Sequence, residues 1–360
     1  MFAIILSFFI FSKPTVTQNY TKEELENYQN FLKNQKKLLT DLFRDYDAGD
    51  SAIYTLRSSK FVNQTTTIHP PRLELQIQCN RLKLIDVDEK EEKVTFLFDY
   101  IAIWKDVRLT WNPDNYGGIA HIYVPQSKIW IPELTLTDVH DILDFKPDEK
   151  KDAWIHHDGS AGFYATIVPS VICQLDVFKF PMDSHVCSID IMYNTYYTNE
   201  FLQVFPSVDP IANVAEIGQL GNGEWQIDWI NATIDKSDIE VANVMKFVAK
   251  IQRNPGFYIS LVIIPAYFIN ALSLIALFLN LNAIPEKLGI GLTNIMAMTF
   301  ILSILAEDLP KTRKIPLLAI YVIVSLVIVV AAIFSIIILK YLKRQRIMFL
   351  ENSRIRVEWF

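Results

Sequence analysis

The sequence predicts two parts, an N-terminal antiparallel β-sandwich followed by an all-α membrane domain. From Leu73 to Val248, short runs alternate apolar and polar residues, the pattern of half-buried strands. After Arg253, three long segments contain no charged residue. The mean hydropathy of +0.20 is high for a soluble protein, because apolar residues are concentrated at the two ends of the chain.

The N-terminal region predicts export. Residues 2–11 form an apolar run that is too short to span a bilayer and is typical of a signal-peptide core. We expect residues 1–17 to be a signal peptide, with a short N-terminal anchor as the alternative. Residues 18–253 carry acceptor triplets for N-glycosylation at Asn19, Asn63 and Asn231, which favours an extracellular domain. The net charge of −6 argues against a nucleic-acid partner.

A helix precedes the predicted strands. Residues 21–46 predict an amphipathic helix, and its apolar stripe consists of Leu32, Leu38, Leu39, Leu42 and Phe43. From residue 73 the apolar period becomes two, with turn signals at residues 112–115, 117–118, 158–159 and 222–223. Many short strands in an exported domain predict an antiparallel β-sandwich.

Three uncharged segments follow, at residues 254–285, 288–306 and 315–339. At about 1.5 Å per residue, each can cross a hydrocarbon core of about 30 Å. We therefore expect a membrane domain over residues 254–339, with helices at about 257–281, 288–306 and 315–339. Residues 340–360 hold six basic residues against two acids, which predicts a cytoplasmic tail. Three crossings then place residues 18–253 outside a plasma membrane.

Two cysteines, Cys173 and Cys187, enclose a loop of thirteen residues with Phe-Pro-Met-Asp at its tip. A thiol pair can also serve redox or metal chemistry, but neither a second Cys-x-x-Cys nor a His-rich set accompanies it. The loop, together with the helices behind it, resembles the signature loop of the pentameric Cys-loop ligand-gated ion channels, and the resemblance covers residues 39–339. It implies a disulfide between Cys173 and Cys187, with Cys79 as a buried free thiol.

The tip of this loop is expected at the junction with the membrane. Its residues are Phe180, Pro181, Met182 and Asp183. Asp183 is the only acid near the tip and Arg253 is the last charge before the first membrane run, so we expect a carboxylate–guanidinium contact near the linker at residues 308–311, which includes Pro310. The alternative is that Asp183 is an ordinary exposed acid.

The second uncharged segment predicts a pore-lining helix. Steps of three and four residues place one stripe on a single face: Gly289, Thr293, Met296, Phe300, Ser303 and Glu307. Glu286 precedes the helix at the cytoplasmic mouth. Five copies would form two acidic rings about 30 Å apart, which attract cations, around an apolar constriction that can close by dewetting. Residues 286–307 are similar to the pore helix of nicotinic acetylcholine receptor subunits.

Other interpretations of this helix stay open. It could pack its small residues, Gly289, Gly291 and Ala297, against neighbouring helices. Met296 stands where the family usually has leucine. Anion-selective members carry a proline at the position of Pro285, although normally without the acid, so chloride selectivity is the alternative to cation selectivity.

Further segments of the exported domain match the family. Residues 104–113 read Trp-x-Asp-x-x-Leu-x-Trp-Asn-Pro, residues 130–133 read Trp-x-Pro-Glu, and residues 222–225 read Asn-Gly-Glu-Trp. The resemblance places Trp104 on the complementary face of the agonist site, where aromatic rings hold a quaternary ammonium through cation–π attraction. Core packing is the equal alternative for Trp104 and the preferred interpretation of Trp111 and Trp130.

The rest of the expected aromatic cage departs from the family. Thr137 stands where the family has tyrosine, and Asn194 where it has tryptophan, with Tyr193 and Tyr196 nearby. Residues 230–241 contain neither adjacent cysteines nor an aromatic residue. The resemblance therefore implies a subunit that lends a complementary face, binds another ligand or is accessory.

No cofactor, metal or catalytic site is predicted. The sequence shows no nucleophile elbow or phosphate-binding glycine loop, and the adjacent His156 and His157 lack thiols or carboxylates at ligand spacing.

We interpret the chain as a divergent, invertebrate nicotinic-type subunit of a pentameric neurotransmitter-gated cation channel, by resemblance postsynaptic. Its partners would be homologous subunits, an acetylcholine-like neurotransmitter, permeant cations and membrane lipid. A non-conducting subunit that modulates assembly and a membrane-anchored enzyme are the rivals.

One expected element is missing from the sequence. The family has a fourth membrane helix after a cytoplasmic loop, but residues 348–360 are too short and too charged for it. Either the sequence is truncated or the subunit lacks this helix.

Overall fold

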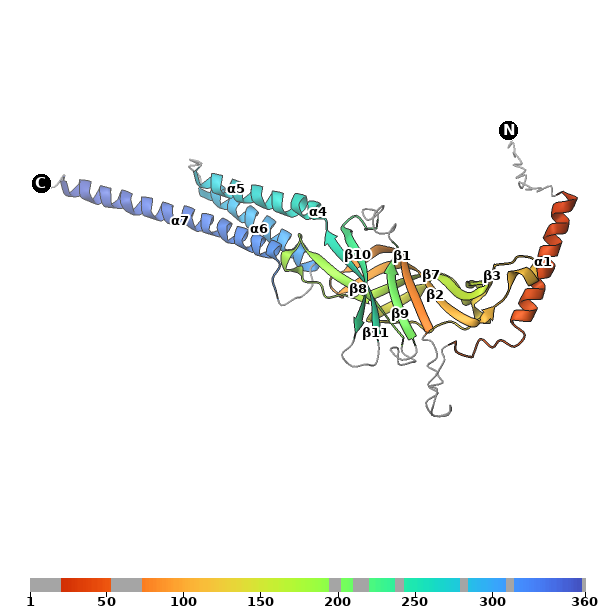
Figure 1. Ribbon diagram of the computed structural model, residues 1–360. Coiled ribbons are helices and arrows are strands. Elements are labelled where there is room, and N and C mark those ends of the chain that lie inside the picture. The colour runs from red at the N-terminus through yellow and green to blue at the C-terminus, as the bar shows by residue number, and fades with distance from the viewer. Residues whose placement is uncertain are drawn as a thin grey trace, which may run out of the picture.

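The computed structural model describes residues 21–52, 73–193, 202–209, 220–236, 243–278, 284–308 and 314–357. The described part is elongated, with helix α1 at one end, a two-sheet sandwich in the middle and the membrane helices at the other end (Figure 1). The sandwich and the helical part therefore follow each other in space as they do in the sequence.

Helix α1 (Lys22–Leu42) begins with a capping box. The Glu24 backbone N–H donates to the Thr21 hydroxyl at 3.2 Å, and the Thr21 N–H donates to the Glu24 carboxylate at 2.8 Å. The predicted apolar stripe packs only at its C-terminal end: Leu38 is buried, whereas Leu32 is exposed.

Two sheets form the sandwich. The larger one has the order β3 (His121–Pro125), β6 (Asp152–His156), β7 (Asp158–Ile172), β2 (Lys93–Thr110), β1 (Leu73–Asp88) and β9 (Leu202–Val208), with β5 (Val139–Asp144) also paired to β7. The smaller one has the order β10 (Trp225–Lys236), β11 (Asn243–Arg253), β8 (Ser184–Met192) and β4 (Thr135–Thr137). All of these pairs are antiparallel except β1–β9, which is parallel. Short 3-10 turns join them: η2 (Pro113–Tyr116), η3 (Gln126–Lys128), η4 (Asp148–Lys150) and η5 (Val177–Lys179).

The core lies between the two sheets. Strands β1 and β2 bury alternate residues over most of their length, as their period-two pattern predicts, and β1 changes phase at its bulges after Cys79 and Leu84. Phe98 of the larger sheet packs on Phe247 of the smaller one, with ring centroids 5.1 Å apart. Cys79 lies in this core as a free thiol, and burial raises its pKa to about 12, so it remains protonated at neutral pH.

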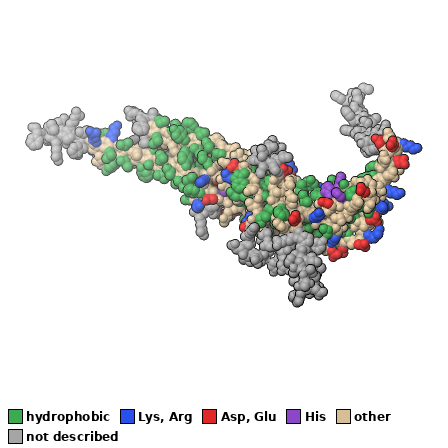
Figure 2. All heavy atoms as spheres, viewed as in Figure 1, with side chains coloured by type: hydrophobic (Ala, Val, Ile, Leu, Met, Phe, Trp, Pro, Cys, Tyr) green, Lys and Arg blue, Asp and Glu red, His purple; other side chains and the backbone are tan. Residues whose placement is uncertain are grey.

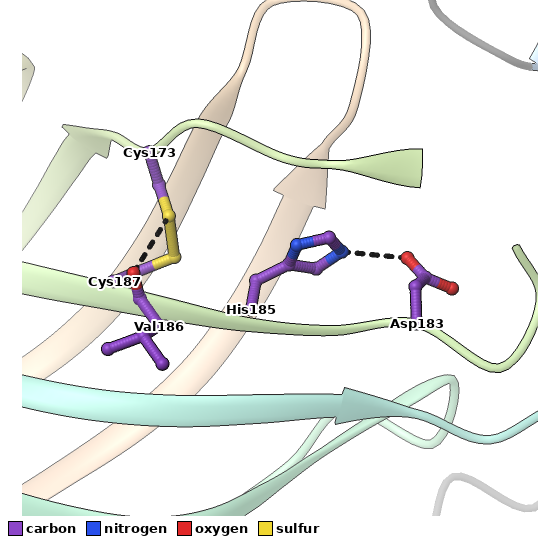
Figure 3. The surroundings of a disulfide bond; sticks show 5 residues. All are labelled: Cys173, Asp183, His185, Val186 and Cys187. Atoms are coloured by element: carbon purple, nitrogen blue, oxygen red, sulfur yellow. Dashed lines mark hydrogen bonds and ion pairs between the residues drawn. A yellow bond between two sulfur atoms is a disulfide. The ribbon is translucent and has the colours of Figure 1, made fainter. Parts of the chain in front are cut away.

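The predicted disulfide is confirmed. Cys173, just after β7, is bonded to Cys187 in β8, with their Cα atoms 5.5 Å apart (Figure 3). The bond closes the loop that contains η5 and fixes its two ends to different sheets.

Three helical stretches are long and apolar enough to cross a membrane: Gly256–Ile275, Lys287–Ala306 and Leu317–Met348. The first stretch runs through α4 (Gly256–Tyr258), the π-helical η7 (Ile259–Ile263) and α5 (Ile264–Phe278). The second lies in α6 (Ile284–Asp308) and the third in α7 (Leu317–Val357). Hydrophobic side chains cover this end of the molecule (Figure 2). Helix α7 extends past residue 339 to Val357 because residues 340–357 contain no Gly or Pro and many strong helix formers.

Other sequence predictions fall partly outside the described residues. The predicted signal peptide, Asn19 and Asn63 lie there, whereas Asn231 is exposed on β10.

The turn signal at residues 158–159 is confirmed. Gly159 has φ 87°, and a Cβ there would lie 2.6 Å from the Asp106 carbonyl oxygen, so only glycine fits.

Replacing Cys187 with serine is expected to lower the free energy of unfolding by on the order of 2–5 kcal/mol, because it releases the loop between the sheets. Surface expression and resistance to proteolysis measure the effect. Cys79→Ala is the matched control and should retain surface expression. Equal expression of the Cys187→Ser and Cys79→Ala variants would contradict a structural role for the disulfide.

Candidate functional site

A buried arginine occupies the junction between the sandwich and the helices. Arg253 ends strand β11 and is 1% exposed. Its guanidinium donates to Asp183 (Nε to Oδ1, 3.0 Å), Glu224 (Nη1 to Oε1, 2.5 Å) and Glu89 (Nη2 to Oε1, 2.7 Å). The structure thus contains the expected contact with Asp183, and it contradicts the alternative of an exposed acid because Asp183 is 2% exposed.

Aromatic rings enclose the same guanidinium. The guanidinium carbon of Arg253 lies 4.0 Å from the ring centroid of Trp225 and 4.7 Å from that of Phe180. Such contacts attract a cation to the faces of aromatic rings. The loop tip, the Asn-Gly-Glu-Trp segment and the end of β11, which are distant in sequence, therefore meet at one side chain.

A histidine completes the polar cluster. The Nε2 atom of His185 lies 2.7 Å from Oδ2 of Asp183, and both side chains are buried (Figure 3). Burial raises the pKa of the Asp183 carboxyl, but the hydrogen bond with His185 and the charge of Arg253 outweigh burial and hold this pKa below its ordinary value. The stability that the ionised carboxylate contributes is therefore present at neutral pH and is lost as the pH falls below about 4.

The loop between the cysteines rests directly on the membrane helices. Its residues Val177 and Phe180 share a buried apolar cluster with residues of α6, α7 and the first membrane segment: Met298, Leu305, Leu318, Val322, Val262 and Ala266. At its edge, Asp176 pairs with Lys314 at 2.9 Å. Met182 is 63% exposed, and Pro310 lies outside the described residues.

Helix α6 has two different faces. Its buried face contains Gly291, Met298 and Leu305. The face predicted to line the pore is exposed wherever its side chains are described: Gly289, Thr293, Met296, Phe300 and Ser303. Glu286 and Glu307 lie in the first and last turns of the helix, and their side chains are outside the described part.

The small residues of α6 divide between these faces. A Cβ added to Gly291 would lie 2.6 Å from Ile333 of α7, so helix packing explains this glycine. A Cβ added to Gly289 would meet no described heavy atom within 4 Å. Packing within the chain therefore does not account for the exposed stripe.

Trp104 is a core residue rather than an exposed one. It is 2% exposed and packs edge-on against Trp130 and Phe163, with ring centroids 6.3 Å and 6.0 Å away. Its indole N–H has no acceptor among the described residues. Of the two interpretations of Trp104, the structure favours core packing, because a ring at this depth is not offered to a ligand.

Two of the remaining ligand-site candidates, Thr137 and Tyr193, lie in or near the smaller sheet. The Thr137 hydroxyl of β4 donates to the Asp190 carbonyl of β8 at 3.5 Å, and Tyr193 is buried just after β8. Asn194 and Tyr196 lie outside the described residues. The structure thus brings Thr137 and Tyr193 to one end of β8, while Trp104 belongs to the other sheet.

Sequence reasoning missed an aromatic surface on the outer face of the larger sheet. Tyr123 is 66% exposed and Tyr164 is 62% exposed. Trp154 lies over Gly162, where a Cβ would come within 2.5 Å of the indole ring. The signal was present for Tyr123, because it alternates with the buried Ile122 and Val124.

The Trp-x-Asp segment also has a structural explanation. Asp106 is buried, pairs with Arg108 at 2.7 Å and accepts a hydrogen bond from the Tyr46 hydroxyl at 3.0 Å. The same hydroxyl accepts from the Trp130 backbone N–H at 2.9 Å. This network ties the segment after α1 to strand β2, and burial raises the pKa of Tyr46 to about 12.

Comparison with known proteins identifies the family. Residues 35–255 match the family "Neurotransmitter-gated ion-channel ligand binding domain", and residues 262–357 match "Neurotransmitter-gated ion-channel transmembrane region". The chain belongs to the neurotransmitter-gated ion channels. These proteins are receptors rather than enzymes, so the enzyme interpretation is set aside.

Relatives in this family are acetylcholine receptor subunits. The chain is 26% identical over 312 residues to acetylcholine receptor subunit beta-type acr-2 of Caenorhabditis elegans, covering 85% of this chain and 50% of that protein. It is 26% identical over 304 residues to neuronal acetylcholine receptor subunit alpha-9 of Homo sapiens, covering 83% and 60%. It is 28% identical over 304 residues to acetylcholine receptor subunit epsilon of Xenopus laevis, covering 80% and 56%. The chain thus spans between half and two thirds of these relatives.

Replacing Asp183 with asparagine is expected to destabilise the extracellular domain by about 3–5 kcal/mol, because Asp183 is the most deeply buried of the three carboxylates that pair with the buried Arg253. Thermal unfolding of the purified chain measures the loss. Asp176→Asn, at the exposed pair with Lys314, is the matched control and should leave the unfolding temperature nearly unchanged. A wild-type unfolding temperature in Asp183→Asn would contradict this account of the junction.

Proposed function

We propose that this chain is a subunit of a pentameric neurotransmitter-gated ion channel in the plasma membrane, with residues 18–253 outside the cell and residues 254–339 in the membrane. One observation carries the proposal. Helix α6 buries one face against its own chain and leaves the stripe that includes Thr293, Met296 and Phe300 exposed. Five such stripes around one axis would line an ion path, with homologous subunits and lipid covering the other faces.

Cation selectivity is part of the proposal. Glu286 and Glu307 stand 21 residues apart at the two ends of α6, which is about 30 Å along a helix. Rings of carboxylates at both mouths would concentrate cations. The resemblance of residues 286–307 to the pore helix of nicotinic acetylcholine receptor subunits also supports cation selectivity. Chloride selectivity, which Pro285 suggests, is the alternative that the recordings below test.

For the ligand, we propose a small cationic neurotransmitter such as acetylcholine, bound between neighbouring subunits. This chain would contribute aromatic rings of the larger sheet, the exposed Tyr123 and Tyr164 and the half-buried Trp154, rather than the buried Trp104. Exposed aromatic faces attract a quaternary ammonium. Such a subunit would supply the complementary face of a ligand site that it shares with a neighbouring subunit, and we expect it at postsynaptic membranes.

A second candidate is an accessory subunit that modulates the assembly of sister subunits without conducting. The burial of Trp104 and the threonine at position 137 favour it, because both remove aromatic rings from the expected agonist cage. Recordings with and without sister subunits distinguish this candidate from a conducting subunit.

In either case, we propose that the Arg253 cluster couples the two parts. The contacts support this role, because Arg253 links the loop tip to Glu224 and Glu89 and is followed within a few residues by the first membrane helix. The loop tip in turn packs against α6 and α7. A shift of the sandwich would therefore reach the pore helix through packed side chains.

Replacing Glu286 with alanine is expected to lower conductance and to shift the reversal potential toward that of chloride, because the ring at the cytoplasmic mouth loses its charge. Glu307→Ala should have a smaller effect at the wider outer mouth. The measurement is the reversal potential under a salt gradient in voltage-clamped cells, for the chain alone and with sister subunits. A wild-type reversal potential that follows chloride would refute cation selectivity, and an unchanged Glu286→Ala channel would favour the accessory subunit.

Replacing Met296 with serine is expected to produce leak current or higher agonist sensitivity, because a hydroxyl eases wetting of an apolar constriction. Ile290→Ser is the matched control, since Ile290 is also exposed on α6 but lies about 100° around the helix from Gly289, off the stripe. The measurement is holding current before and after agonist application. Leak in Ile290→Ser but not in Met296→Ser would show that a different face lines the ion path.

A further inference from the structure

Two histidines face each other on the outer surface of the larger sheet. His121 of β3 and His156 of β6 are direct partners in the antiparallel register, and their ring centroids lie 5.9 Å apart. Both side chains are exposed. Figure 2 shows histidine side chains gathered over this part of the sheet. This pair could not be predicted from the sequence, because its members come from separate strands.

The hydrogen bonding of the strands brings these two side chains close. The His157 N–H donates to the Ala120 carbonyl at 2.9 Å. Residues 120 and 157 therefore form the hydrogen-bonded pair, and His121 and His156 form the neighbouring non-hydrogen-bonded pair. In such pairs the Cα atoms are about 4.5 Å apart and the side chains approach more closely than in hydrogen-bonded pairs.

Neighbouring residues fix the two imidazoles on a rigid support. Tyr123 stands edge-on to His121 at 6.0 Å, and Trp154 stands edge-on to His156 at 5.1 Å. Beneath the surface, the adjacent residues Ile122 and Ile155 are buried in the core. A site on paired strands holds its geometry more closely than a site on a loop.

We propose that His121 and His156 form a surface site for a divalent transition-metal ion that favours imidazole, Zn²⁺ or Cu²⁺. Zinc binds a histidine nitrogen at about 2.0–2.1 Å, so two rings on one tetrahedral ion have centroids about 5 Å apart. Rotation of the two side chains would bring their ring centroids from 5.9 Å to this separation. Mg²⁺ and Ca²⁺ do not suit the site, because they prefer oxygen ligands.

The coordination positions that the two imidazoles leave unfilled indicate an exchangeable ion. No group of three or more His, Cys, Asp or Glu residues in the described part of the chain could hold a metal. Water would therefore complete the coordination of an ion held by two imidazoles. Such a site binds a metal reversibly at the surface. The proposal is independent of ion conduction by the chain.

The test is copper binding by the purified full chain in detergent micelles, followed by electron paramagnetic resonance. We expect a spectrum with two equivalent imidazole nitrogens, displaced by excess Zn²⁺. His121→Asn and His156→Asn should each weaken binding at least tenfold, because each removes a ligand. His140→Asn and His157→Asn are matched controls at other exposed histidines and should bind copper as the wild type does.

Copper binding that survives in both His121→Asn and His156→Asn would overturn the proposal, as would its loss in His157→Asn alone. A second measurement needs no variant. Diethylpyrocarbonate labels exposed imidazoles, and Zn²⁺ should protect His121 and His156 on the wild-type chain while His140 stays reactive, as mapped by mass spectrometry. Equal labelling of all three with and without Zn²⁺ would also overturn the site.

Discussion

The buried guanidinium of Arg253 is the constraint on which the junction depends. A charge removed from water is tolerated only when it is paired and hydrogen-bonded, and here Asp183, Glu89 and Glu224 supply carboxylates while Trp225 and Phe180 supply ring faces. These partners come from three separate segments, so satisfying one side chain fixes the loop tip, the β1–β2 turn and the start of β10 together. Because the first membrane helix begins at Gly256, the orientation of the helical part follows from the same cluster.

Much of this architecture could be predicted from local pattern. Alternation over β1 and β2 indicated half-buried strands, and the absence of charge indicated the membrane helices. The contact between Asp183 and Arg253 was predictable because Asp183 is the acid at the loop tip and Arg253 is the last charge before the first membrane run. The contacts of Glu89 and Glu224 were not predictable, because both residues are distant from Arg253 in sequence and Glu89 lies in a turn among other acids.

Features that depend on strand register could not be predicted. Trp104 continues the buried phase of the alternation in β2, but its contacts with Trp130 and Phe163 depend on how β2 pairs and packs with its neighbours. The opposition of His121 and His156 likewise requires the alignment of β3 with β6. The length of α7 was underestimated because loss of hydrophobicity marks the end of a membrane crossing, not the end of a helix.

Two surfaces remain exposed in the single chain, the stripe on α6 and the aromatic face of the larger sheet, and assembly with homologous subunits would give both a role. The most direct test of the channel account is thiol accessibility in α6. Met296→Cys and Met298→Cys channels would be treated with a charged, membrane-impermeant thiol reagent while current is recorded. The account predicts irreversible block in Met296→Cys and none in Met298→Cys, whose side chain is buried against the rest of its own chain. Block in Met298→Cys with none in Met296→Cys would contradict it.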